Sequence, residues 1–150
     1  VMKKWGKISR RKMISHNFHV KVYYKDIDQM GIVYYSRYFE FFELARTELL
    51  KSIGFAVKDI EKNDFFLPVV YASCEYIKSA SFEDKLIIES QIIKTPSARL
   101  QIDYNIISEN DQSVIAKGKT VHGFINRKGK PQKPPRALLE KIELLLSNER

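Results

Sequence analysis

Apolar and polar residues alternate along residues 18–25, FHVKVYYK, so that every second side chain is apolar or aromatic. A period of two is typical of a strand with one buried face. Residues 26–33 interrupt the alternation, and Gly31 within them allows a tight turn. The pattern therefore predicts a half-buried β-strand that ends in a turn.

A long helix is predicted directly after this turn, from about Tyr34 or Ser36 to Ile53. Its apolar positions recur at helical spacing and form a wide aromatic stripe: Tyr38, Phe41, Phe42, Ala45 and Leu49. Ser36 is suited to cap the first turn, and Gly54 is suited to end the last one. A stripe of this width indicates a helix that packs deep against a sheet.

Four further strands are predicted after an irregular or partly helical connection at residues 55–66. They cover residues 67–77, 85–94, 99–107 and 113–125. The strand at 85–94 is apolar on both faces, which indicates an interior position in the sheet. Short links rich in turn-forming residues favour antiparallel neighbours. A short helix at residues 136–147 closes the chain.

The order of these elements is strand, long helix, four strands and short helix. It predicts an α+β fold in which one antiparallel sheet wraps around the long helix. One helix covers only one face of a sheet, so the outer face and the edge strands still need cover. We therefore expect an oligomer.

The net charge of +8 is concentrated at one end of the chain. Six lysines and arginines and no acidic residue lie within residues 1–12, so +2 remains for residues 13–150. We predict a basic, disordered leader at 1–12 and a single domain at 13–150. Because the body is close to neutral, no nucleic acid partner is expected, and the leader is not expected to recruit a membrane.

The cysteine content and the hydropathy pattern bear on the cellular setting. The single cysteine, Cys74, cannot form an intramolecular disulfide or a cysteine metal cluster. A reducing cytoplasm is the simplest setting for such a chain. No run of about 18 apolar residues occurs, so no membrane span is predicted.

Candidate chemistry concentrates in the turn before the long helix, because the Walker loop, GxGxxG, GxSxG and HExxH motifs are all absent. Asp28 lies about seven residues before the predicted helix start. A helix N-terminus offers unpaired N–H groups that can hold an oxyanion, and a nearby carboxylate can attack a carbonyl or deprotonate water. This arrangement suggests acyl transfer to water without a metal.

Spacing alone does not single out Asp28. By that criterion a structural role of Asp26 and Asp28 in the turn is favoured. Glu40 and Glu43, on the predicted helix, are rival carboxylates. For these two the simpler interpretation is a surface charge paired with a neighbouring arginine.

Residues 22–55, VYYKDIDQMGIVYYSRYFEFFELARTELLKSIGF, are similar to the signature of the 4-hydroxybenzoyl-CoA thioesterase family, in particular its YbgC-like acyl-CoA thioesterase branch. The family pattern is a strand, then D-x-D-x-x-G-[IV]-V-Y, then an aromatic helix with F-E-x-A-R-x-E. Residues 26–34 and 42–48 match the two motifs. Weaker similarity extends over nearly all of the chain after Met13.

The resemblance implies a hotdog fold, which is an antiparallel five-stranded sheet wrapped around a long central helix. It implies that Asp28 is the catalytic carboxylate, acting as nucleophile or general base, and that Asp26 supports the turn. The backbone N–H near Tyr35 would face the thioester oxygen, and Gly31 would shape the turn. The YbgC-like branch usually has histidine where this chain has Tyr35, and tyrosine there resembles the 4-hydroxybenzoyl-CoA branch. The acyl preference therefore stays open.

The implied reaction is hydrolysis of a short-to-medium aliphatic or aromatic acyl-CoA to free acid and CoA. Such sites usually form between two subunits of a homodimer, and dimers commonly pair into tetramers. The candidates for CoA contacts are Lys94, Thr95, Ser97 and Arg99. CoA is part of the substrate, and no cofactor or metal is expected. The alternative is a non-catalytic hotdog protein that binds acyl-CoA or acyl-carrier protein.

Overall fold

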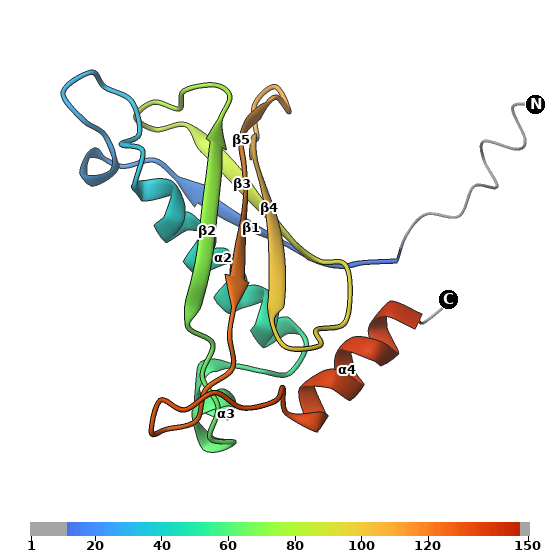
Figure 1. Cartoon of the computed structure of the whole chain (residues 1–150). Coiled ribbons are helices and arrows are strands. Elements are labelled where there is room, and N and C mark those ends of the chain that lie inside the picture. Colours follow the sequence, from blue (N-terminus) through green and yellow to red (C-terminus); the bar gives the residue numbers. More distant parts are fainter. Residues whose placement is uncertain (1–11, 148–150) are drawn as a thin grey trace, which may run out of the picture.

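A computed structural model describes residues 12–147 as an antiparallel sheet that wraps around one long helix (Figure 1). The sheet has five strands in the order β1-β3-β4-β5-β2, and every neighbouring pair is antiparallel. The strands are β1 (Ile14–Lys21), β2 (Val69–Tyr76), β3 (Lys85–Ile92), β4 (Leu100–Ser108) and β5 (Val114–His122). The helices are α2 (Arg37–Ser52), α3 (Val57–Lys62) and α4 (Arg136–Ser147). The predicted α+β hotdog architecture is confirmed.

Helix α2 is held by the aromatic stripe that the sequence predicts, since all five of its members are buried. Phe42 has no exposed surface and stacks on Tyr104 of β4, with ring centroids 4.3 Å apart. A Cβ on Gly118 of β5 would lie 2.6 Å from the Phe42 ring, so this close approach needs a glycine. Burial of one such aromatic side chain stabilises the fold by about 1.5–3 kcal/mol. The stripe therefore fixes α2 over the centre of the sheet.

The first strand differs from its predicted range, because β1 runs from Ile14 to Lys21 rather than over residues 18–25. A short 3-10 turn, Tyr24–Asp26, follows it. The Asp26 carboxylate accepts a hydrogen bond from the Tyr23 N–H at 2.9 Å, and the Asp26 N–H donates to the Tyr23 carbonyl at 2.9 Å. This local bonding ends the strand, although the apolar alternation continues to Tyr24.

The ends of α2 agree only in part with the prediction. Ser36 occupies the N-cap position, but its backbone is helical and its hydroxyl makes no capping bond, so the predicted cap is wrong. The helix begins at Arg37, nine residues after Asp28. Gly54 follows the helix with φ +97°, the left-handed conformation that a C-terminal stop requires, as predicted.

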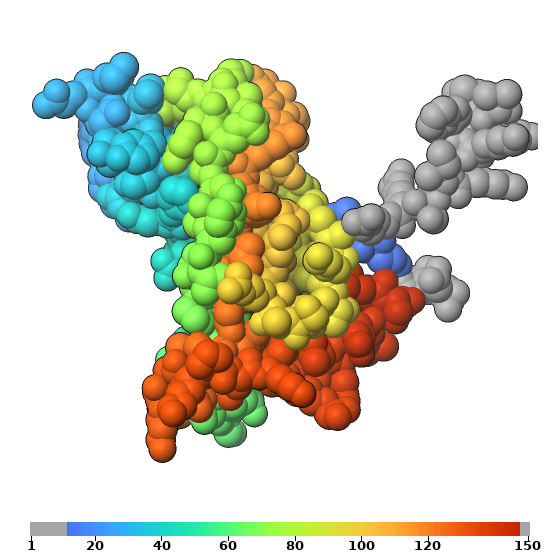
Figure 2. Space-filling view, in the orientation of Figure 1, coloured from blue at the N-terminus to red at the C-terminus, as the bar shows by residue number. Residues whose placement is uncertain are grey.

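The two sheet edges are covered differently. Helix α4 contacts β1 at one edge, and α4 has the predicted bounds of 136–147. Strand β3 pairs on both sides, as predicted for an interior strand. Strand β2 at the other edge is exposed along most of its length, and Figure 2 shows it uncovered as the green band down the visible face. Its free edge exposes Val69, Tyr71 and Tyr76, each about half accessible.

Two predictions concern the chain outside this sheet. Within the described residues, no helix is long and apolar enough to cross a membrane. The predicted basic leader, residues 1–12, lies outside the described residues except for Lys12.

Candidate active site

The turn between β1 and α2 is a small hairpin closed by backbone hydrogen bonds. The Asp28 N–H donates to the Ile32 carbonyl at 2.9 Å, and the Gly31 N–H donates to the Asp28 carbonyl at 3.0 Å. Gly31 has φ +80°, and a Cβ there would meet no atom within 4 Å. The conformation rather than the space therefore requires glycine, which agrees with the predicted role of Gly31 in shaping the turn.

The side chain of Asp28 is half-buried and only half used by the turn. Its Oδ1 accepts a hydrogen bond from the Met30 N–H at 2.8 Å, which orients the carboxylate. Its Oδ2 accepts from no protein donor in the part of the chain that the structure describes. One carboxylate oxygen is thus fixed and the other is free to act.

Asp28 lines a pocket of about 340 Å³ at the N-terminal end of α2. The other lining residues are Ile32, Val33, Tyr34, Tyr35, Tyr38, Tyr76, Ile77, Lys78 and Ser79. Four of these are tyrosines, so the wall is largely aromatic with polar hydroxyl tips. A pocket of this kind can hold an apolar or aromatic group next to a carboxylate.

Asp26 has different surroundings from Asp28, although the two are separated by one residue. It is 4% exposed, and its Oδ1 lies 3.6 Å from Nε of Arg37. Its carboxylate accepts the Tyr23 N–H, and its carbonyl accepts the Tyr34 N–H at 2.8 Å. Asp26 is therefore tied to the 3-10 turn and to the first residue of α2, and it does not line the pocket.

Tyr35 lies in the turn just before α2, where backbone N–H groups lack helical partners. Among residues 12–147, the N–H groups of Tyr35 and Ser36 donate to no protein acceptor. Tyr35 is 60% exposed, and it lines the same pocket as Asp28. A residue with a free backbone donor and a residue with a free carboxylate oxygen therefore line one pocket.

Tyr76 is a pocket residue that sequence reasoning missed. It ends β2, and its hydroxyl donates to the Tyr35 carbonyl at 2.8 Å from 41 residues further along the chain. Burial raises the pKa of Tyr76 to about 12, so the phenol stays a neutral donor at physiological pH. The strand predicted at residues 67–77 includes Tyr76, but a strand pattern in the sequence does not show which distant residues its side chains contact.

The rival carboxylates on α2 lie outside the pocket. Glu40 is exposed and paired with Arg37, and Glu43 is exposed. Neither residue lines the pocket that contains Asp28. Their surroundings match the simpler interpretation as surface charges.

The predicted CoA contacts lie at the opposite end of the sheet from Asp28. Lys94, Thr95, Ser97 and Arg99 form the loop from β3 to β4, next to α4. The Lys85 end of β3 pairs with Lys21, close to the 3-10 turn, and the eight residues of β3 separate this end from the loop by roughly 26 Å. Within one chain, the structure therefore does not bring these residues to Asp28.

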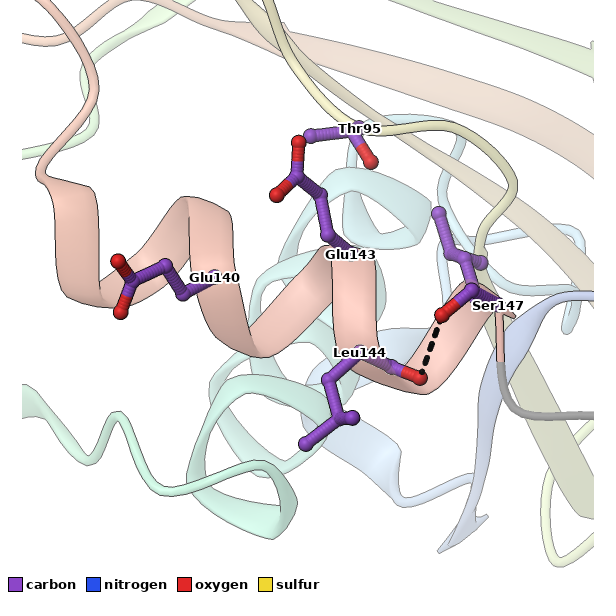
Figure 3. A pocket seen from close by; sticks show the side chains of 6 residues that line it. Thr95, Glu140, Glu143, Leu144 and Ser147 are labelled. Carbon is purple, nitrogen blue, oxygen red and sulfur yellow. Dashed lines mark hydrogen bonds between the residues drawn. The ribbon is translucent and has the colours of Figure 1, made fainter.

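The surroundings of Thr95 are also unsuited to a phosphate. Thr95 lines a shallow hollow with Glu140 and Glu143 of α4, and Figure 3 shows the Glu143 carboxylate directed toward Thr95. Two carboxylates beside a phosphate would repel it. The contact between Thr95 and CoA stays a prediction. Thr95 could make it only with a CoA that is bound in the Asp28 pocket of a second subunit.

His122, the last residue of β5, is a packed, hydrogen-bonded residue. It is 1% exposed, its Nε2 lies 2.8 Å from the Thr120 hydroxyl, and its Nδ1 lies 3.0 Å from the Leu67 carbonyl. Burial lowers the pKa of His122 to about 4, so the ring is neutral. No cluster of three or more potential metal ligands occurs within residues 12–147.

A family model described as the thioesterase-like superfamily matches residues 22–142. The match includes the Asp28 hairpin, α2 and all strands after β1. The chain belongs to the thioesterase-like superfamily. The predicted family and the predicted class of enzyme, a thioester hydrolase, are therefore confirmed.

Individual relatives agree with this assignment. The chain is 32% identical to the acyl-CoA thioesterase YbgC of Haemophilus influenzae over 92 residues, which are 61% of this chain and 68% of that protein. It is similar to the crystal structure of a 1,4-dihydroxy-2-naphthoyl-CoA thioesterase from Synechocystis, with a TM-score of 0.77, 25% identity, and 85% and 95% of the two chains covered. A 4-hydroxybenzoyl-CoA thioesterase complex has a TM-score of 0.78 at 16% identity, covers 86% and 99% of the two chains, and supports the fold alone.

Proposed function

We propose that this protein hydrolyses acyl-CoA thioesters in the pocket that contains Asp28. The observation that carries the proposal is that Asp28, which has a free carboxylate oxygen, and Tyr35, which has a free backbone N–H, line the same pocket. Acyl-CoA and water would give a carboxylic acid and CoA. A cytoplasmic setting, suggested by the single cysteine, is part of the proposal.

In this reaction the Tyr35 N–H donates to the thioester oxygen as negative charge develops there. The free oxygen of Asp28 acts in one of two ways. As a general base it takes a proton from water, which attacks the carbonyl carbon and displaces the CoA thiolate. As a nucleophile it forms an acyl-aspartyl anhydride with loss of the thiolate, and water then cleaves the anhydride. Both routes consume one water and return one proton to CoA.

A homodimer is the proposed state, because β2 leaves a free edge lined by Val69, Tyr71 and Tyr76. Exposed edges of this length are prone to pair with another strand. Antiparallel pairing of β2 about a two-fold axis would set the Val69 end of one subunit beside the Tyr76 end of its partner. The pocket would then lie at the subunit interface, and two dimers could pair further into a tetramer.

Contacts to the CoA phosphates would then come from the partner. At the Val69 end of the sheet, Lys58 and Lys62 of α3 and Arg127 of the hairpin after β5 line a common hollow, in which one acid, Glu61, accompanies the three basic side chains. Phosphates bind well to such lysines and arginines. Lys94, Ser97 and Arg99 lie at the same end of the sheet, so the earlier prediction for them also depends on the partner subunit.

The proposal is tested by incubating the purified protein with a series of aliphatic and aromatic acyl-CoAs and measuring thiol release with a thiol-reactive dye. We expect release of CoA from at least one member, and the profile will give the acyl preference. Tight binding of acyl-CoA by calorimetry without thiol release from any member would contradict the proposal. It would favour a binding protein for acyl-CoA or acyl-carrier protein.

A further inference from the structure

Tyr76 connects the end of the free edge strand to the backbone of the proposed active site. Its hydroxyl donates a hydrogen bond of 2.8 Å to the carbonyl of Tyr35. This is a contact between a side chain of β2 and the main chain just before α2, and the two residues are 41 positions apart. This hydrogen bond belongs neither to the strand pairing of β2 nor to the backbone bonding of α2, so its effect is on the turn before the helix.

That effect concerns the two peptide planes that flank Tyr35. The carbonyl of the first plane, Tyr34 O, accepts the Arg37 N–H at 2.9 Å. The carbonyl of the second plane, Tyr35 O, accepts the Tyr76 hydroxyl. The N–H groups of these same planes, on Tyr35 and Ser36, have no protein acceptor within residues 12–147. Both planes are thus fixed at the carbonyl side, while the donor side is left free.

Tyr76 is itself held in place. Its ring packs edge-on against Tyr38, with centroids 5.2 Å apart and planes at 74°, and Tyr38 is 3% exposed. Burial raises the pKa of both phenols to about 12. The hydroxyl of Tyr76 therefore remains protonated across the working range of pH and can donate to the carbonyl throughout.

We propose that Tyr76 is a positioning residue, which holds the Tyr35 carbonyl and so fixes the peptide plane of the free Ser36 N–H, the second donor to the thioester oxygen beside the Tyr35 N–H. The inference rests on the function proposed above and adds a residue to it. An oxyanion donor is effective only when its direction is fixed before the charge develops. Tyr76 supplies that fixation from a different strand, and it takes no proton and forms no covalent bond.

A positioning role affects turnover more than binding. Loss of the hydroxyl leaves the aromatic wall intact, so the affinity for the acyl group should change little. The peptide plane that carries the Ser36 N–H becomes free to rotate, and small misplacements of groups that contact the reacting atoms are costly to the rate. We therefore expect kcat to fall roughly tenfold or more, with KM within about twofold of the wild-type value.

The test is the substitution Tyr76→Phe, assayed on the full-length protein with the best acyl-CoA from the screen. The matched control is Tyr24→Phe. Tyr24 lies outside the pocket and off the β2 edge, its exposed ring packs against Phe82, and its hydroxyl makes no hydrogen bond within residues 12–147. Tyr24→Phe should leave kcat and KM unchanged. Equal kcat in the two variants, or a rise in KM with unchanged kcat in Tyr76→Phe, would overturn the positioning role.

A second measurement does not depend on turnover. A hydrogen bond to the Tyr35 carbonyl polarises the Ser36 N–H of the same peptide, so the amide nitrogen shift of Ser36 should move in Tyr76→Phe and stay constant in Tyr24→Phe. An unmoved Ser36 shift would refute the contact and the proposal. If the wild-type protein releases no CoA from any acyl-CoA, the proposed function fails, and the Ser36 shift still decides whether Tyr76 holds this peptide.

Discussion

The turn around Asp28 differs from a buried polar network on β4 and β5, formed by Tyr104, Thr120 and His122, in whether its hydrogen-bonding groups have partners. In the network, the Tyr104 hydroxyl, the Thr120 hydroxyl and both His122 ring nitrogens have hydrogen-bond partners at 2.7–3.0 Å, and the three residues are buried. In the turn, an oxygen of Asp28 and the N–H of Tyr35 have no protein partner within residues 12–147. Saturated groups stabilise the core, whereas unsaturated groups next to a pocket are available for chemistry.

The same contrast separates the two aspartates of the turn. Asp26 is buried, accepts a hydrogen bond from the Tyr23 N–H and forms an ion pair with Arg37 at 3.6 Å, while Asp28 is half-buried with one free oxygen. Spacing in the sequence cannot distinguish them, because both are acids in one turn. Their environments predict that Asp26 contributes mainly to stability and that Asp28 contributes mainly to reaction.

The largest expected effect on stability is that of Asp26→Asn. It removes the charge of a buried carboxylate that accepts the Tyr23 N–H and lies beside Arg37, so we expect a loss of about 3 kcal/mol in the free energy of unfolding. Urea denaturation measures this loss. Asp64→Asn is the matched control, because Asp64 also lies 3.6 Å from an arginine, Arg127, but both side chains are exposed. Its expected loss is below about 1 kcal/mol. Equal losses in the two variants would show that the burial of Asp26 does not increase its contribution to the free energy of unfolding.

The second prediction uses His122, whose pKa is lowered by burial to about 4 from an ordinary value of 6.5. Between these values the unfolded chain binds a proton that the folded chain does not, so stability falls as pH falls from about 6.5 to about 4. The contribution amounts to about 3 kcal/mol. The free energy of unfolding measured against pH should lose this slope in His122→Gln. An unchanged slope in that variant would show that a group other than His122 causes the pH dependence of stability.

The smallest expected effect on stability is that of Gly31→Ala. The alanine meets no atom but must adopt φ +80°, which costs about 1 kcal/mol. Gly123→Ala is the control, since Gly123 has no positive φ and its added Cβ would make an ordinary contact with Val70. Melting temperatures of the two variants measure the difference. A lower melting temperature for Gly123→Ala than for Gly31→Ala would contradict the account of the turn.

Much of the fold could be predicted from the sequence because local patterns determined it. The helical stripe of α2 specifies its buried face, the two apolar faces of residues 85–94 specify an interior strand, and both predictions are confirmed. The end of β1 could not be predicted, because the alternation continues into a turn that the Asp26 side chain closes. The predicted N-cap at Ser36 is wrong for a different reason. Its backbone is already helical, whereas a serine that caps a helix through its hydroxyl has an extended backbone.

The site could be predicted only as far as its local part extends. The hairpin of Asp28 and Gly31 is contiguous in the sequence and has the expected turn. Tyr76 reaches the site across 41 residues, and no local pattern reports such a contact. The loop of Thr95 and Arg99 was assigned by family resemblance, and the strand order places it at the far end of the same sheet.

The most direct test of the central claim is the rate of CoA release by Asp28→Asn at saturating substrate. Asparagine keeps an oxygen for the Met30 N–H and so preserves the turn, but it can neither attack the thioester nor take a proton. We expect kcat to fall by about a thousandfold, with an unchanged melting temperature and with Glu43→Gln fully active as the control. Wild-type kcat in Asp28→Asn, or inactivity confined to Glu43→Gln, would contradict the assignment of Asp28.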